Sequence, residues 1–344
     1  MSVPSGFGPI RLLVIQPTSL CNLDCTYCYL PDRSRRHLLD GDLVGPILQR
    51  VLESPFVGEG FTILWHAGEP LTRSPSFYDQ ATDTLRSLLR AHPGPVVDQS
   101  VQTNGTLIND HWCACFERNG IDVGVSLDGP AFLHDPHRRT RRGLGSHADT
   151  MRGVRCLQEA GIPFSVISVL TRTSLHHADA LVDFYLENGI AEVGFNMEET
   201  EGVHLRSSLA EEGTEALYRR FLERVWDRVA EAGGALRIRE FEDFRAFAVS
   251  GNRIDHTDLN RPMAIVSVDH QGNFSTFDPE LLSVETRYGL FQLGNVREDS
   301  LEAACRSDRF GRIWADMREG IERCRASCAY FGLCGGGAGS NKYW

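Results

Sequence analysis

The chain has 344 residues, of which 42% are hydrophobic and 24% are charged, a composition typical of a soluble globular protein. Its length allows a large core and favours two domains, or a barrel with an appendage. The formal net charge of −11 argues against a nucleic-acid partner, because backbone phosphates require a concentrated basic surface. No apolar run reaches the roughly 20 residues of a membrane span, and the N-terminus lacks a secretory apolar region. We therefore expect a cytoplasmic protein without nucleic-acid or membrane partners.

The chain contains ten cysteines, and in a cytoplasmic protein these are more typical of metal ligands or core residues than of disulfides. Cys113, Cys115 and Cys156 lie in helical apolar patterns, so we expect them to be ordinary buried thiols. Six others form two groups, which are Cys21, Cys25 and Cys28 near the start and Cys324, Cys328 and Cys334 near the end.

Between residues 11 and 196, apolar runs of strand length alternate with segments of helical periodicity. The expected strands are 11–16, 60–66, 96–102, 122–127, 163–170 and 191–196. The expected helices are 40–52, 74–89, 109–119, 146–160 and 174–188. Parallel strands joined by right-handed helical crossovers bury such apolar strands on both faces. Six units of this kind make a partial barrel, two short of a closed eightfold one.

Each conspicuous polar motif of this region follows an expected strand. In a barrel of parallel strands, the loops after the strands carry the site. Their shared position favours one site at this end of the barrel more strongly than any single motif does. The motifs are the first cysteine group, Gly68-Glu69, Thr103-Asn104-Gly105, Ser126-Leu127-Asp128 and Thr171.

The remainder of the chain has a different pattern. Residues 207–250 look like two helices separated by Gly233-Gly234, and residues 264–278 look like a hairpin that turns at 271–273. A helix is expected at 301–317, followed by a segment rich in cysteine and glycine. We therefore expect a barrel at 1–205, a helical bridge at 206–262 and a C-terminal cap at 263–344.

The first cysteine group has the spacing of a metal site. Spacings of four and three residues on a short loop let three sulfurs turn toward one point, and thiolates suit iron–sulfur clusters or zinc. Three protein ligands leave one metal position open, which is typical of a site that performs chemistry. Structural zinc usually has four ligands, and His37 is the only close candidate for the fourth. We therefore expect a catalytic metal cluster.

With these motifs in view, the chain resembles the radical SAM superfamily, whose CxxxCxxC signature matches Cys21, Cys25 and Cys28. The resemblance implies an α/β fold with a partial (β/α)6 radical SAM barrel. It implies that the three cysteines bind three irons of a [4Fe–4S] cluster and that S-adenosylmethionine (SAM) chelates the fourth. An electron from the cluster cleaves SAM to methionine and a 5′-deoxyadenosyl radical, so a reductant such as flavodoxin or ferredoxin is a further implied partner.

The resemblance also implies SAM contacts. The GGEP motif of the family appears as Ala67-Gly68-Glu69-Pro70, in which Ala67 replaces a glycine, and Gly68 and Glu69 are expected to meet the SAM amino group. An arginine suits the SAM carboxylate because a guanidinium binds it with two hydrogen bonds. The other implied contacts are Tyr27 beside adenine, Asn104 in the cavity, Ser126 and Asp128 near ribose, and Arg138, or in competition Arg141, at the carboxylate.

Ordinary structural roles are the alternatives for several of these residues. Glu69 also fits a solvated loop carboxylate, and Arg138 also fits a surface arginine or part of an anion-binding loop at 138–142. Asp128 also fits a simple turn residue, because Asp-Gly-Pro favours a turn by itself.

The second cysteine group resembles a SPASM domain, which binds auxiliary [4Fe–4S] clusters. Its spacing, Cys324-x3-Cys328-x5-Cys334, is close to the Cys-x2-Cys-x5-Cys core of that family. Two cysteines of the pattern are missing, since Asp278 stands near one position and 294–296 is not followed by the other. The resemblance therefore implies one auxiliary cluster, with a fourth ligand that is unassigned and for which Cys305 is a candidate. A zinc knuckle or reduced thiols in a structural cap are the alternatives.

Further stretches resemble the peptide maturases of the GRRM system, radical SAM/SPASM enzymes that build three-residue cyclophanes on ribosomally made peptides. These stretches are 16–33, 274–281 and the tail 334–344. The resemblance implies a precursor peptide as partner and a cross-link from an aromatic ring carbon to a nearby β-carbon. Asp278 and Glu280 are candidates for the base, because they replace expected cluster ligands, although each also fits an ordinary exposed carboxylate. The leader of the precursor is expected to add as a strand to a hairpin edge.

Two other functions stay open at this point. One is a radical SAM reaction of another kind, either sulfatase-type oxidation of cysteine or serine or formation of a thioether. The other is a scaffold that carries an iron–sulfur cluster or zinc, binds peptide and catalyses nothing.

Overall fold

The computed structural model of the chain describes residues 6–340, apart from the side chains of Glu280 and Ser283. Its main sheet has the strand order β12-β9-β8-β1-β2-β3-β4-β5-β6-β7. Strands β1 to β6 are parallel, each paired with the next along the chain, which confirms the six expected strands. They are β1 (Leu12–Ile15), β2 (Gly60–Trp65), β3 (Val96–Thr103), β4 (Ile121–Ser126), β5 (Phe164–Leu170) and β6 (Glu192–Met197).

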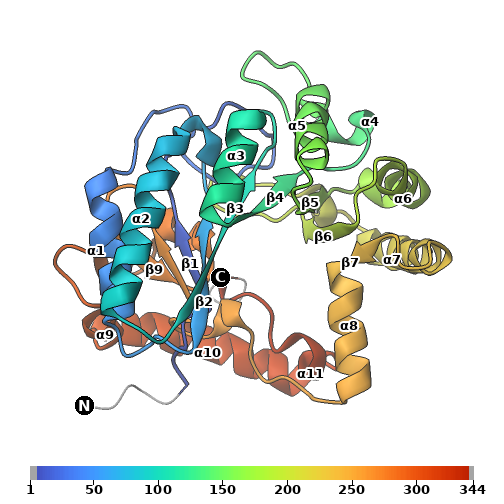
Figure 1. The fold of residues 1–344 in the computed structure, drawn as a ribbon. Helices are drawn as coiled ribbons and strands as arrows, with labels where there is room; N and C mark the ends of the chain where they lie inside the picture. Colours follow the sequence, from blue (N-terminus) through green and yellow to red (C-terminus); the bar gives the residue numbers. More distant parts are fainter. Residues whose placement is uncertain (1–5, 341–344) are drawn as a thin grey trace.

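The crossovers between these strands are helical, as expected. The helices line the outer side of the curved sheet, as Figure 1 shows, because each buries one apolar stripe against it. The Asn109 side chain caps α3 by accepting backbone N–H groups of His111 and Trp112, and Gly120 ends that helix with a φ of 62°. The helices are α1 (Gly41–Leu52), α2 (Pro75–Ala91), α3 (Asp110–Asn119), α4 (Ala131–His134), α5 (His147–Glu159) and α6 (Ala178–Glu187).

The bridge contains α7 (Thr214–Glu231) and α8 (Arg239–Ser250), with Gly233 and Gly234 at positive φ between them, as expected. It also contains a short strand that the sequence pattern did not indicate, β7 (Arg237–Ile238), which extends the sheet beside β6. In Figure 1, α8 runs from this end of the sheet down to the C-terminal helices.

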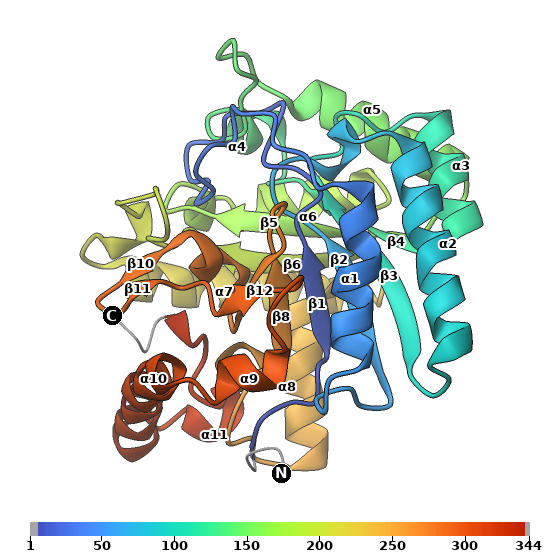
Figure 2. The same cartoon turned by 90° about the vertical axis from the view of Figure 1, so that its left-hand side faces the viewer.

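The expected hairpin is present as β8 (Ile265–Val268) and β9 (Asn273–Thr276), and Gly272 in its turn has a φ of 86°. The sequence pattern did not indicate where this hairpin lies. In the structure, β8 pairs in parallel with β1 over the full length of both strands. All four residues of β8 are buried, so the hairpin continues the barrel sheet and covers the edge of β1 (Figure 2). The strand β12 (Gly294–Asn295) pairs with β9, and β10 (Glu285–Thr286) pairs with β11 (Gly289–Leu290) in a separate sheet.

The helix expected at 301–317 is two helices, because Ser307 interrupts it and caps the second by accepting the N–H of Phe310. They are α9 (Leu301–Cys305) and α10 (Asp308–Ser327), followed by α11 (Phe331–Cys334). Short 3-10 turns occupy 70–72, 174–176, 208–210, 258–260 and 279–283. Cys113 and Cys115 belong to the hydrophobic core, as expected, and Cys156 packs against it. Within residues 6–340, none of the helices has the length and hydropathy that a membrane crossing requires.

Candidate active site

The first cysteine group lies on a loop between β1 and α1, here named the cysteine loop (residues 20–33). A second segment, residues 137–141 between α4 and α5, holds it through backbone hydrogen bonds. The N–H of Asp24 donates to the carbonyl of Arg139 at 2.7 Å, and that of Thr26 donates to His137 at 3.0 Å. The basic stretch at 138–142 is therefore a structural partner of the cysteine loop.

The three thiols of the cysteine loop are close enough to influence one another's charge. Burial, with contributions from Glu69 and the other two thiols, raises the pKa of Cys21 far above its ordinary value. Burial raises the pKa of Cys25 to about 11, although Arg138 acts in the opposite direction. Bound cations are what convert such thiols to thiolates at neutral pH.

Among the described residues, no three side chains of His, Cys, Asp or Glu are grouped closely enough to bind one metal ion. A [4Fe–4S] cluster takes one thiolate on each iron, so its ligands lie farther apart than those of one zinc ion. Cysteine thiolates suit both kinds of site, which differ in the spacing that they require of their ligands.

Glu69 is buried, with only 1% of its surface exposed, so the interpretation as a solvated loop carboxylate is wrong. Its Oε1 accepts the hydroxyl of Thr103 at 2.6 Å and the N–H of Leu71 at 3.0 Å, and its Oε2 accepts the N–H of Asn104 at 2.8 Å. Burial raises the pKa of Glu69, while these three donors oppose the rise. The carboxylate therefore joins the ends of β2 and β3.

Asn104 connects this junction to the cysteine loop. Its Nδ2 donates to Oδ1 of Asn22 at 2.8 Å and lies 3.9 Å from Sγ of Cys21. Its Oδ1 accepts both the N–H and the hydroxyl of Thr106. The side chain is therefore fixed beside the first cysteine.

Gly68 is the position of this motif with the strictest steric demand. Its φ is 63°, and a Cβ added there would lie 2.5 Å from the carbonyl oxygen of Thr18 and 2.8 Å from that of Leu20. We expect Gly68→Ala to lower the free energy of unfolding by roughly 2–5 kcal/mol, from left-handed strain and from the clash with the backbone. Thermal denaturation of the two proteins measures this difference.

Gly161→Ala is the matched control for this prediction. Gly161 has a similar φ of 67°, but an added Cβ would have no atom within 4 Å. Gly161→Ala should therefore lower the free energy of unfolding only by the left-handed strain, about 1–2 kcal/mol. Equal losses in the two variants would show that the contact with Thr18 and Leu20 does not restrict Gly68.

Asp128 and Arg138 form a buried ion pair, with exposed fractions of 3% and 7%. Nε and Nη2 of Arg138 donate to the two carboxylate oxygens at 3.0 and 3.1 Å, and the hydroxyl of Tyr27 donates to Oδ2. Burial alone would raise the pKa of Asp128, but Arg138 and His134 lower it below its ordinary value. The interpretations as a simple turn residue and a surface arginine are therefore wrong, because both groups help to fix Tyr27 on the cysteine loop.

The two remaining implied SAM contacts also have protein partners. Ser126 accepts a hydrogen bond from Nε2 of Gln102 at 2.9 Å. Arg141 is exposed, and its Nε and Nη2 donate to the carbonyl of Cys21 at 3.0 and 2.7 Å. Arg141 therefore braces the cysteine loop. The structure brings all eight implied SAM residues to the carboxyl ends of β2, β3 and β4 and the loops beside them.

His134 stabilises the ion pair through hydrogen bonds, and no sequence pattern indicates this role. It is fully buried, and its Nδ1 accepts the N–H of Asp128 at 3.3 Å. Its Nε2 lies 3.0 Å from the hydroxyl of Ser146, which donates to the carbonyl of Arg138 at 2.8 Å. This chain of hydrogen bonds requires the neutral imidazole with its proton on Nε2.

Stability should therefore fall as the pH is lowered toward 5. Burial lowers the pKa of His134 from 6.5 to about 3, so the unfolded chain binds the extra proton between these values. The contribution of neutral His134 to the free energy of unfolding is complete above pH 6.5. It is lost as the pH falls, by about 2 kcal/mol between pH 7 and pH 5. Denaturant unfolding at several pH values should show a flatter slope for His134→Gln. The exposed His111→Gln should keep the slope of the wild type, and an equal flattening there would refute this assignment.

His66 is a second histidine that sequence reasoning missed, although it directly precedes Ala67. Burial lowers its pKa to about 4, and its Nδ1 has no hydrogen-bond partner among the described residues. Its Nε2 lies 3.5 Å from the hydroxyl of Tyr29, which follows Cys28. A neutral imidazole thus lies between the cysteine loop and the Gly68-Glu69 motif.

Asp278 lies at the end of β9 and is 3% exposed, so the interpretation as an ordinary exposed carboxylate is wrong for it. Its Oδ2 accepts the N–H of Ser340 at 2.8 Å. Burial raises its pKa, and Glu199 adds to the rise. A carboxylate with a raised pKa is a stronger proton acceptor than an ordinary carboxylate. The side chain of Glu280 lies outside the described part of the chain.

The second cysteine group is less enclosed. Cys324 lies in α10, Cys328 ends that helix, and Cys334 is exposed in α11. Cys305 precedes α10, and about 24 Å of helix separates its start from Cys324. Cys305 is therefore not the fourth ligand in this conformation. Residues 341–344 of the resembling tail lie outside the described residues.

Comparison with known proteins identifies the family. Residues 15–185 match the model of the Radical SAM superfamily. An uncharacterized protein of Synechocystis sp. is 52% identical over 343 residues, which cover 99% of this chain and 86% of that protein. The serine-type anaerobic sulfatase-maturating enzyme of Klebsiella aerogenes is 32% identical over 206 residues, which cover 59% of this chain and 50% of that enzyme.

Solved structures share the fold. The structure of anSMEcpe with bound AdoMet and Cp18Cys peptide matches with a TM-score of 0.77 at 20% identity, over 96% of this chain and 89% of that one. The structure of Streptococcus suis SuiB bound to precursor peptide SuiA matches with a TM-score of 0.63 at 19% identity, over 90% and 67% of the two chains. The chain therefore belongs to the radical SAM superfamily and is an enzyme with sequence similarity to serine-type anaerobic sulfatase-maturating enzymes.

Proposed function

We propose that this enzyme cross-links an aromatic ring carbon to the β-carbon of a nearby residue within a ribosomally made precursor peptide. The observation that carries the proposal is the buried carboxyl group of Asp278, which directly precedes a residue that lines a cavity. Pro279, directly after Asp278, lines the same cavity as Tyr29, directly after Cys28. Asp278 is therefore the immediate neighbour in sequence of a residue in this lining, to which the cysteine loop also contributes.

Membership of the superfamily implies a [4Fe–4S] cluster and SAM. Cys21, Cys25 and Cys28 fit the cluster, because they are three thiols on one loop, and burial raises the pKa of Cys21 and Cys25 so that bound cations favour their thiolate forms. When bound, this cofactor pair supplies a 5′-deoxyadenosyl radical that abstracts a hydrogen atom. Eight residues are proposed to bind and orient SAM. They are Tyr27, Gly68, Glu69, Asn104, Ser126, Asp128, Arg138 and Arg141.

In the proposed reaction the peptide loses a β-hydrogen atom, and the resulting carbon radical forms a bond to the ring. The ring regains aromaticity by losing one proton and one electron. Asp278 is proposed to take the proton, and the electron passes to a one-electron acceptor such as oxidised flavodoxin or ferredoxin. An auxiliary cluster on Cys324, Cys328 and Cys334 remains a prediction, because the described residues there form no metal group.

A peptide substrate is supported by the structural relatives that were solved with a bound peptide, anSMEcpe and SuiB. The outer strand of the cap, β12, is a short edge at which a leader peptide could add as a further strand. Resemblance to the cyclophane-forming maturases in the segments 16–33 and 274–281 supports the aromatic cross-link in particular.

Co-expression with the small open reading frame nearest to the gene tests the proposal. Tandem mass spectrometry should show loss of two hydrogens and an unbroken three-residue segment that contains an aromatic residue. An unmodified mass, or a modification outside any aromatic segment, would overturn the proposal.

Oxidation of a serine or cysteine is the second candidate, because of the 32% identity to a serine-type sulfatase-maturating enzyme. Oxidation of serine also removes two hydrogens, so mass alone does not separate the two functions. An aldehyde-reactive hydrazide does, since it labels an oxidised serine and leaves a carbon–carbon cross-link unlabelled.

A further inference from the structure

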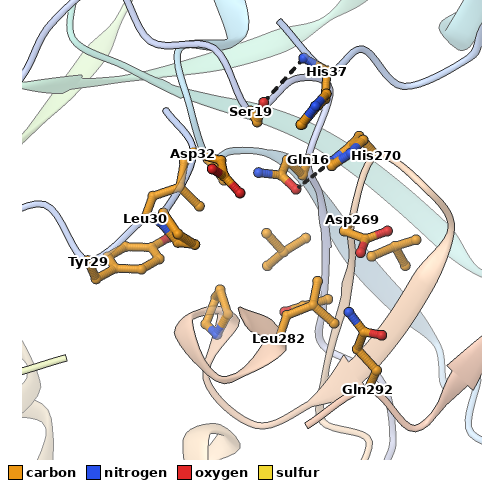
Figure 3. A pocket seen from close by; sticks show the side chains of 16 residues that line it. Gln16, Ser19, Tyr29, Leu30, Asp32, His37, Asp269, His270, Leu282 and Gln292 are labelled. Carbon is orange, nitrogen blue, oxygen red and sulfur yellow. Dashed lines mark hydrogen bonds between the residues drawn. The ribbon is translucent and has the colours of Figure 1, made fainter. Parts of the chain in front are cut away.

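A cavity of about 200 Å³ lies between the barrel and the C-terminal cap. Figure 3 shows side chains of both parts around it. Tyr29, Leu30 and Asp32 come from the cysteine loop, and Gln16 comes from the end of β1. The cap contributes Ser267 and its neighbours in β8, together with His270, Leu282 and Gln292.

Part of the cavity lining is apolar. Leu30, Pro31 and Leu282 form it together with the ring of Tyr29. A dry cavity of about 150 Å³ lined by Leu, Ile and Phe is large enough for benzene, so a volume of about 200 Å³ has room for an aromatic ring. The volume of this cavity therefore suits an aromatic ring.

Polar side chains also line the cavity, among them Ser267 and Gln16. Ser267 is 2% exposed, and its hydroxyl has no hydrogen-bond partner among the described residues. Gln16 is held in place, since its Oε1 lies 3.4 Å from Nδ1 of His270, whose ring stacks on His37 at 5.0 Å. A buried hydroxyl without a partner costs stability unless a ligand or water bonds to it.

We infer that this cavity receives an aromatic side chain of the peptide that carries an N–H or O–H on its ring, an indole or a phenol. The inference rests on the proposed function only for the source of that side chain. The ring packs against Leu30 and Leu282, and its polar hydrogen is donated to Oγ of Ser267. A phenyl or aliphatic side chain fills the volume and leaves Ser267 unpaired.

Equilibrium dialysis of the SAM-loaded holoenzyme under anaerobic conditions tests this inference with three probes. These are the N-acetyl amides of tryptophan, tyrosine and phenylalanine. Wild-type enzyme should bind the tryptophan or the tyrosine probe about 3- to 10-fold more tightly than the phenylalanine probe, as expected for one neutral hydrogen bond. Ser267→Ala should remove this preference and leave binding of the phenylalanine probe unchanged.

Ser275→Ala is the matched control. Ser275 pairs directly with Ser267 across the hairpin, is fully buried and also has an unpaired hydroxyl, but it does not line the cavity. This variant should keep the preference for a polar ring. Leu282→Trp should fill the cavity and abolish binding of all three probes, whereas Leu290→Trp, at a half-exposed position in β11, should not.

Several results would overturn the inference. Equal affinity of wild-type enzyme for the three probes would do so, as would the same loss in Ser267→Ala and Ser275→Ala. Weaker SAM binding in Leu282→Trp, with peptide binding retained, would assign the cavity to SAM instead. Failure of the cross-linking proposal can be told apart from failure of this inference. In that case the three probes would bind as described, but no cross-linked peptide would form.

Discussion

Replacing Cys25 by alanine is expected to reduce release of 5′-deoxyadenosine from SAM to the level of a sample without enzyme. The proposed cluster has only three protein ligands, so loss of one leaves two irons without a protein thiolate. Iron content should fall as well. The measurement is anaerobic reconstitution, addition of dithionite and SAM, and chromatography of the products.

Cys156→Ala is the control for this experiment, because its thiol is also partly exposed but lies on α5 against the core. It should bind iron and cleave SAM as the wild type does. If Cys25→Ala cleaved SAM at the wild-type rate, the assignment of the cluster to the cysteine loop would be refuted.

Replacing Asp278 by asparagine should lower formation of the cross-linked peptide by about 10²- to 10⁴-fold, the usual contribution of a general base. Release of 5′-deoxyadenosine should continue, because the proposed role of Asp278 follows hydrogen abstraction. An asparagine oxygen can still accept the N–H of Ser340, so the local fold should be kept. The two products are measured in the same reaction by mass spectrometry.

The pH dependence gives a second readout for Asp278. Burial raises its pKa, so its base form accumulates at a higher pH than that of an unperturbed aspartate. Cross-linking by the wild type should therefore rise with pH through this raised pKa, and the rise should be absent in Asp278→Asn. Asp299→Asn, a cap carboxylate that accepts the N–H of Asn295, should behave as the wild type. Equal loss of both products in Asp278→Asn would argue for a structural role.

The sequence predicted the barrel well because its signals are local. Each apolar run and each helical stripe is encoded within one segment, and the six parallel strands formed where these patterns stood. The parallel pairing of β8 with β1 could not be predicted in this way, since those strands are about 250 residues apart. A four-residue strand that is buried throughout also gives no alternating pattern to indicate its neighbour.

The residues of the candidate site also differ in whether a local sequence motif marks them. Cys21, Gly68 and Asp128 were found because motifs mark them, and the structure brings their loops together. His134 and Ser267 were not found, because a buried histidine and a serine in an apolar strand have no distinctive sequence context. Their significance comes from atoms contributed by distant segments, which only the folded chain brings into hydrogen-bond range.

The pairing of β8 with β1 determines whether the barrel can be studied as a truncated fragment. Leu12 to Ile15 share a ladder with Ile265 to Val268, so a fragment that ended before residue 263 would expose an apolar strand edge at the centre of the sheet. Such edges recruit other chains and cause aggregation. A truncated barrel should therefore be recovered mainly as insoluble protein, and the cap is best studied through point variants within the intact polypeptide.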